Sequence, residues 1–191
     1  MSGDGNGAVR HLRSALVAPY FVPGQILLDD DLTALLNYSA QSLQTVVRAV
    51  FGIGVASGME VARKEGGGEN WVEVSEGVAF DGHGRIIDLN TPQRIDVNFP
   101  MSPGTYWLVL ISEKEEPFEQ RRSMGLTEDE QRLHPTRSRL AFRLAIVSSK
   151  PSGPYHIVLG TLKKEAEGSW VCEKADRMTV KTPGSPSVAG A

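Results

Sequence analysis

The chain has 191 residues, of which 40% are hydrophobic and 23% are charged, and its formal net charge is −3. This composition predicts a globular protein with one sizeable core. The acidic balance disfavours binding to nucleic acid or to an anionic membrane, and no apolar run approaches the ~20 residues that span a bilayer.

Both ends of the chain are rich in small residues and predict no fixed conformation. We expect a flexible N-terminal arm at 1–18, a single α+β module at 19–181 and a disordered tail at 182–191. The apolar run after Arg13 is too short for a secretory signal, and Cys172 has no second cysteine to pair with. We therefore expect cytoplasmic synthesis without a signal peptide.

The segment "APYFVPGQIL" precedes the first periodic element and has neither a helical nor a clear strand period. Its prolines keep it extended, so Tyr20 and Phe21 are candidate anchors for a neighbour's groove or sheet edge. The competing interpretation is that both rings fold back under the protein's own helix. The sequence leaves these two alternatives equal.

A long amphipathic helix is predicted from Asp30 to Phe51, because large apolar residues recur at three- and four-residue spacing. Asp29, Asp30 and Asp31 lie where a carboxylate caps free backbone N–H groups, which explains them better than a calcium site does. We expect the apolar face to pack on the rest of the module.

Three glycines follow this helix in "FGIGVASGMEV", namely Gly52, Gly54 and Gly58. In a dinucleotide-binding fold such glycines follow a strand and open a helix, whereas here they follow a helix and open a strand. The nearby helix end carries the negative pole of the dipole, which repels phosphate. We expect a corner of the backbone and no nucleotide.

From Gly54 onward the apolar residues recur at every second position, which predicts a run of short strands. The stretch from Tyr106 to Ile111 is apolar on both faces and predicts a central strand. Asp81 and Gly82 predict a hairpin turn. One helix followed by many strands predicts an α+β fold, with the helix packed on a mainly antiparallel β-sandwich or open barrel.

Asp81, His83 and Arg85 lie close together in "FDGHGR" and are the residues that acid–base chemistry would use. A solvated hairpin tip accounts for them more simply. The four histidines are scattered without metal-ligand spacing, so we expect no metal, no cofactor and no catalytic residues.

The segment 112–139 is the most charged stretch and interrupts the β pattern. It predicts a solvated excursion, or alternatively a partner-binding arm with Phe118 as its anchor. A short helix at 127–133 is expected inside it, because Thr127 and Glu130 have capping-box spacing.

These motifs, taken in order, resemble the N-terminal module of tail-fibre or baseplate-associated proteins from phage tails and contractile injection systems. The resemblance covers about residues 19 to 165, and the matching positions are Phe21, Gly24, Gln25, Leu27, Gly52, Gly54, Gly58, Gly77, Ala79, Asp81, Gly84 and Arg85. It implies a particle subunit without catalytic residues. The chain ends after this module without fibre repeats, which favours an adaptor over a fibre.

We therefore expect a non-enzymatic structural or adaptor subunit of a phage-tail-like particle. Its partners would be other subunits or further copies of itself, with no nucleic acid and no membrane insertion. A second hypothesis is a carbohydrate- or ligand-binding β-sandwich, which a cleft lined by tryptophans would favour. A third and weaker one is a hydrolase that uses Asp81 and His83.

Overall fold

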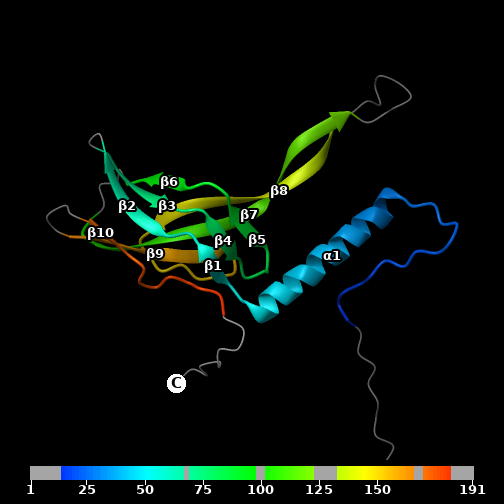
Figure 1. Cartoon of the computed structure of the whole chain (residues 1–191), viewed down its shortest axis with the longest axis horizontal. Helices are drawn as coiled ribbons and strands as arrows, with labels where there is room; N and C mark the ends of the chain where they lie inside the picture. The colour runs from blue at the N-terminus through cyan, green and yellow to red at the C-terminus, as the bar shows by residue number, and fades with distance from the viewer. Residues whose placement is uncertain (1–13, 67–68, 98–101, 123–132, 166–169, 182–191) are drawn as a thin grey trace, which may run out of the picture. The chain divides into compact units, whose positions relative to one another are not determined.

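The structure is a computed structural model, and it describes residues 14–66, 69–97, 102–122, 133–165 and 170–181. These residues contain one helix and ten strands, shown in Figure 1. The elements are α1 (Asp29–Val50), β1 (Gly54–Gly58), β2 (Val61–Gly66), β3 (Glu69–Val74), β4 (Gly77–Phe80), β5 (Ile86–Leu89), β6 (Gln93–Asp96), β7 (Gly104–Arg122), β8 (Leu133–Val147), β9 (His156–Lys164) and β10 (Trp170–Glu173). Of the described residues, those up to Leu43 form one compact unit, and those from Gln44 onward form a second.

A tight turn precedes α1 and is joined to its first turn. The Gln25 amide donates to the Val22 carbonyl at 3.1 Å, and Gly24 has a φ of 82°, as a type II turn with Pro23 and Gly24 at its centre requires. The Gln25 side chain accepts from the Val22 amide and donates to Asp31. Asp31 also accepts from the Leu28 amide at 3.0 Å, so the predicted acidic cap is confirmed for this residue.

The helix starts and ends one residue earlier than predicted, and its periodic apolar residues differ in exposure. Val47 is buried, whereas Leu32, Leu36 and Leu43 are exposed. That the whole apolar face packs on the β module therefore stays a prediction.

The described strands form three antiparallel sheets, with the orders β1-β4-β5, β2-β3-β6 and β10-β9-β7-β8. This confirms an α+β fold with antiparallel sheets. The pairings do not close the strands into one barrel, and the finer prediction of a sandwich or open barrel stays a prediction.

All three sheets contribute side chains to one hydrophobic core. The buried members are Val55, Met59, Val72, Val74, Ala79, Ile87, Leu89, Leu108, Leu110, Ile157, Leu159, Leu162 and Trp170. β7 lies between β8 and β9, and Leu108, Val109 and Leu110 are fully buried. These observations confirm the prediction of a central strand at this position. A strand that is buried on both faces has a continuous run of apolar residues in its sequence.

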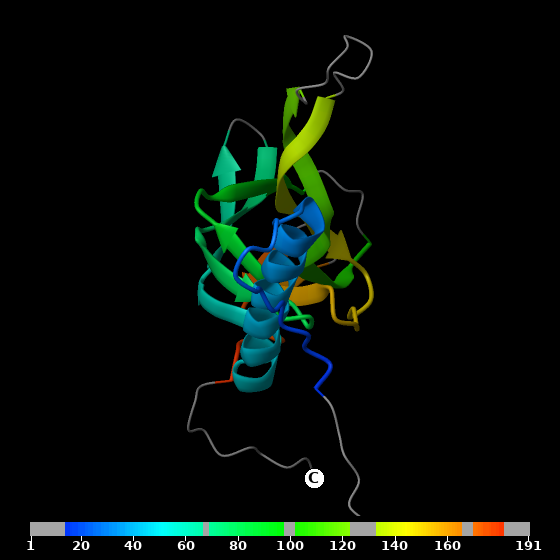
Figure 2. The same ribbon diagram turned by 90° about the vertical axis from the view of Figure 1, so that its right-hand side faces the viewer.

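The expectation that 112–139 interrupts the β pattern is wrong for the described part of that segment. β7 pairs with β9 only as far as Ile111, but its pairing with β8 continues to Arg122. Figures 1 and 2 show β7 and β8 continuing as a two-stranded ribbon beyond the other strands. Cross-strand polar contacts accompany this pairing, including the 2.8 Å ion pair of Arg143 with Glu113. Residues 127–132 of the expected short helix lie outside the described residues, and Leu133 begins β8.

The glycine corner after α1 is confirmed by its backbone angles. Gly52, Gly54 and Gly58 all have positive φ, at 71°, 143° and 60°. A Cβ on Gly58 would lie 2.1 Å from the Glu76 carbonyl oxygen, and one on Gly54 would lie 2.6 Å from the Thr179 carbonyl carbon. Gly52 ends the helix, and the other two glycines let neighbouring backbone segments approach closely.

The C-terminal end of the described chain joins two of the sheets. The Val55 amide of β1 donates to the Met178 carbonyl, and the Met178 amide donates to Val158 of β9, both at 2.9 Å. The Val180 amide donates back to Val55 at 3.1 Å. This segment explains why β1 begins with a glycine, since Thr179 passes directly over it.

Candidate functional site

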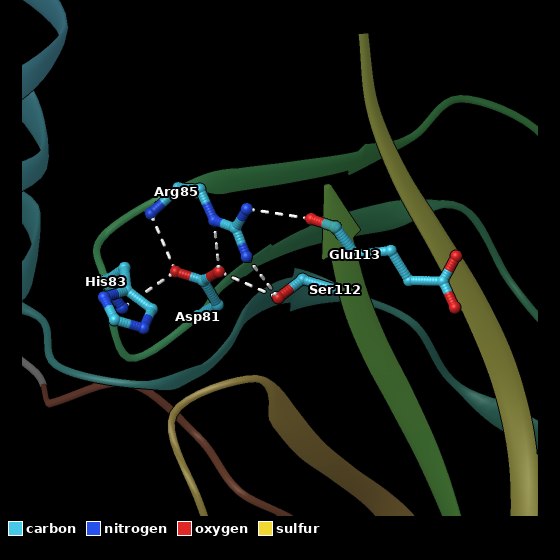
Figure 3. A network of polar contacts seen from close by, with 5 residues as sticks. All are labelled: Asp81, His83, Arg85, Ser112 and Glu113. Atoms are coloured by element: carbon cyan, nitrogen blue, oxygen red, sulfur yellow. Dashed lines mark hydrogen bonds and ion pairs between the residues drawn. The ribbon is translucent and has the colours of Figure 1, made fainter. Parts of the chain in front are cut away.

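A buried carboxylate occupies the turn between β4 and β5 (Figure 3). Asp81 is fully buried, and its Oδ1 accepts from the backbone amides of His83 and Arg85, both at 2.9 Å. Its Oδ2 accepts from the Arg85 Nε at 2.7 Å and from the Ser112 hydroxyl at 2.8 Å. Four donors therefore compensate for the desolvation of one charged group.

Arg85 extends this network to the central strand. Its two terminal nitrogens donate to the Ser112 hydroxyl at 2.9 Å and to the Glu113 carbonyl at 2.8 Å. Its guanidinium also lies 5.5 Å from the centre of the Tyr155 ring. The β4–β5 turn is thereby fixed to β7 and to the segment that precedes β9.

The expected solvated hairpin tip is therefore wrong for Asp81, although it holds for the exposed His83 side chain. The His83 ring packs on Tyr155, with ring centroids 4.7 Å apart, and only its backbone amide contacts Asp81. A general base needs its imidazole within hydrogen-bond reach of the group it acts with. These contacts describe a structural ion pair and not an acid–His pair.

Glycines allow the same turn to lie close to its neighbours. The residue of this turn with a left-handed backbone conformation is Gly84, which has a φ of 79°. The Asp81-Gly82 sequence had suggested Gly82 for this position. A Cβ on Gly84 would lie 2.1 Å from the Gln44 carbonyl oxygen, and one on Gly82 would lie 2.7 Å from Pro154. The Gly82 amide donates to the Pro154 carbonyl at 2.7 Å.

The two predicted aromatic anchors lie side by side in the sequence but differ in exposure. Tyr20 is 86% exposed and Phe21 is 38% exposed. Large exposed apolar residues continue from there into the start of α1, namely Val22, Ile26, Leu27 and Leu28. Exposed apolar residues that gather in one segment are a feature of interaction sites. The role of these two residues as anchors stays a prediction.

Phe118, the third predicted anchor, lies in the ribbon part of β7. The flanking residues Pro117 and Glu119 face Ser138 and Arg137 of β8. The conformation of the Phe118 side chain lies outside the described part of the chain. Its predicted role is therefore untested.

Two shallow hollows lie along β8 beside β6. One has a volume of about 370 Å³ and the other about 180 Å³, and both are lined by Gln93 and Phe142. No tryptophan lines either hollow. Trp170 is instead buried in the core, and the Arg94 guanidinium lies 4.3 Å from the Trp71 ring. These two hollows therefore lack the tryptophans that would favour a carbohydrate-binding cleft.

Within the described ranges, no cluster of three or more His, Cys, Asp or Glu side chains could hold a metal ion. The same residues include no helix long and apolar enough to cross a membrane.

Sequence reasoning missed Ser112 as a partner of Asp81. The two residues are 31 positions apart, and a serine that follows an apolar run carries no signal of its own. The sequence contains one hint of a buried network at this turn. The Asp-x-x-Gly-Arg spacing places the Arg85 side chain beside the Asp81 carboxylate.

The sequence matches no protein-family model and no curated protein. Its fold is similar to a chain of the baseplate complex from the type VI secretion system, with a TM-score of 0.51, 14% identity and 84% of this chain covered. It is also similar to a chain of the type VI secretion system TssK-TssF-TssG baseplate subcomplex, with a TM-score of 0.51, 14% identity and 83% covered.

This protein spans less than two thirds of either similar chain, covering 41% of the first and 60% of the second. At 14% identity the similarity establishes a shared fold.

Proposed function

We propose that the protein is a non-enzymatic structural subunit of a phage-tail-like particle, in which it acts as a baseplate or fibre-attachment adaptor. In this role it docks to other particle subunits and is incorporated into the particle after cytoplasmic synthesis. The proposal includes no nucleic acid, no membrane insertion and no cofactor.

The observation that carries this proposal is the fold similarity to two type VI secretion baseplate chains over more than four fifths of the protein. The motif order from Phe21 to Arg85 resembles that of proteins from the same class of particle. The Asp81 network supports the non-enzymatic assignment, because its donors hold the turn together and, among the described side chains, no imidazole donates to the carboxylate.

For the docking surface we propose Tyr20 and Phe21, with Phe118 on the ribbon as a second point of contact. Tyr20 combines large apolar area with a polar tip, which is the chemistry of interface anchors. The turn at Gly24 and its link from Gln25 to Asp31 hold the segment ahead of α1 without covering the Tyr20 ring.

The test measures how much of a Tyr20→Asp variant is incorporated into particles in cells that produce the protein. Asn37→Asp is the matched control, because it adds the same charge at an exposed position of α1. Particles are isolated, the subunit is quantified by immunoblot, and the folding of each purified variant is checked by thermal melting. We expect Tyr20→Asp to melt like the parent but to be depleted from particles, while Asn37→Asp is incorporated.

Two results contradict different parts of the proposal. If Tyr20→Asp is incorporated like the parent, Tyr20 is not an anchor. If the parent protein itself never co-purifies with a particle, the adaptor function is wrong.

A further inference from the structure

One face of α1 carries apolar residues at the spacing that helix pairs use. Successive steps of four and three residues define the α1 seam, which consists of Leu32, Leu36, Ser39, Leu43, Val46 and Val50. This is the 3.5-residue repeat that keeps a stripe facing a partner helix. The five apolar members are between 42% and 70% exposed.

The described contacts near the end of α1 centre on Gln44, Val47 and Phe51, which lie beside the seam and are not members of it. Val47 is 5% exposed, whereas Val46 and Val50 are 56% and 42% exposed. The residues on the side of Val47 meet the β4–β5 hairpin: Gly84 lies against the Gln44 carbonyl, and the Phe51 and Phe80 ring centroids are 5.6 Å apart. The module therefore covers the Val47 side and leaves the seam open there.

The charges of α1 favour a copy of the same helix as the partner. From Leu32 to Val47 the sequence contains no charged residue, so two copies bring no like charges together along this stretch. The charged residues are Asp29, Asp30 and Asp31 in the first turn and Arg48 in the last. An antiparallel pair places each acidic first turn near the partner's basic last turn, whereas a parallel pair places the acidic turns together.

The seam also matches itself when one copy is reversed. Steps of four, three, four, three and four are the same in both directions, which pairs Leu32 with Val50, Leu36 with Val46, and Ser39 with Leu43. A two-fold interface requires this kind of self-complementarity.

We propose that the α1 seam is a docking surface for the α1 seam of a second copy of this chain, in antiparallel orientation. The pairing covers the exposed apolar residues of both helices. It does not depend on membership of a particle, because the purified chain alone tests it.

The first experiment measures the mass of the purified full-length protein by sedimentation velocity over a concentration series. A double variant, Leu36→Glu with Leu43→Glu, places charges on the seam. Its matched control, Ala34→Glu with Gln41→Glu, adds the same charges at the same spacing on the opposite face. We expect the parent and the control to form dimers and the seam variant to be monomeric with an unchanged fold by circular dichroism.

The second experiment tests orientation by disulfide cross-linking in a Cys172→Ser background. We expect a mixture of Leu36→Cys and Val46→Cys chains to form a heterodimeric cross-link. A parallel pair would instead cross-link Leu36→Cys chains to one another, which would overturn the antiparallel arrangement. A parent that stays monomeric at every concentration overturns the proposal. In that case, early melting of the seam variant would show that the seam packs on the protein's own module.

Discussion

Replacing Gly58 by alanine tests the backbone corner that follows α1, and Gly52 supplies its control. Both glycines have left-handed φ, at 60° and 71°. They differ in the space around them: a Cβ on Gly58 would lie 2.1 Å from the Glu76 carbonyl oxygen, whereas one on Gly52 meets only Lys181 Cε at 3.9 Å. Comparing the two alanine variants therefore separates the cost of a left-handed φ from the cost of a steric clash.

The two substitutions differ in expected magnitude. A left-handed φ costs a non-glycine residue about 1 to 2 kcal/mol, so Gly52→Ala should lower the free energy of unfolding by about that amount. Gly58→Ala carries the same penalty and in addition forces the β1–β4 pairing to shift, since Gly58 is paired with Gly77 there. Overpacking a tight site adds about 1 to 3 kcal/mol, which makes the expected total about 2 to 5 kcal/mol.

Thermal melting of the full-length chain measures this difference. For a domain of this size about 1 kcal/mol corresponds to about 2 to 4 °C, so Gly58→Ala should melt clearly below Gly52→Ala. Equal melting temperatures for the two variants would refute the claim that close approach to Glu76 requires a glycine. Melting temperatures equal to the parent's would refute the corner as a whole.

Two further predictions concern buried polar groups. Asp81→Ala should lower the free energy of unfolding by about 3 to 5 kcal/mol, because it leaves the Arg85 guanidinium without its carboxylate. Ser112→Ala removes only one hydrogen bond and should lower the free energy of unfolding by about 1 kcal/mol. If urea titrations give equal values for the two variants, the ion pair is not the centre of the network. Burial, followed by the Glu173 charge, raises the pKa of the Cys172 thiol from 9.0 to about 11. The folded chain thus holds this proton more tightly than the unfolded chain does. The resulting contribution to the free energy of unfolding is fully present below pH 9 and should be lost as the pH rises through about 11. The decrease in the free energy of unfolding over this range should be smaller in Cys172→Ala.

The elements that were predictable from the sequence are those with a strong local period. α1 was placed to within one residue at each end, because its apolar spacing, acidic first turn and following glycine all lie within one short stretch. The central position of β7 was predictable for a similar reason, since only a strand covered on both faces carries six consecutive apolar residues. The α+β class follows from these two features together.

The features that escaped prediction depend on contacts between distant residues. The ribbon of β7 and β8 is held by pairs such as Glu113 and Arg143, and neither residue alone distinguishes a strand from a charged loop. The buried state of Asp81 depends on Ser112, and the requirement for a glycine at position 54 depends on Thr179. Local patterns contain no information about such pairs, so Asp81 was assigned to solvent.

Several of the residues that carry the resemblance also build the scaffold. Gly24 and Gly58 adopt left-handed conformations, and Asp81 and Arg85 form the ion pair beneath the β4–β5 turn. These residues shape the backbone and not the surface that the chain presents. The resemblance and the fold similarity therefore carry the same kind of information, which is architectural. Information about partners must come from residues whose replacement leaves the fold intact, and we expect the exposed Tyr20 and the α1 seam to meet that condition.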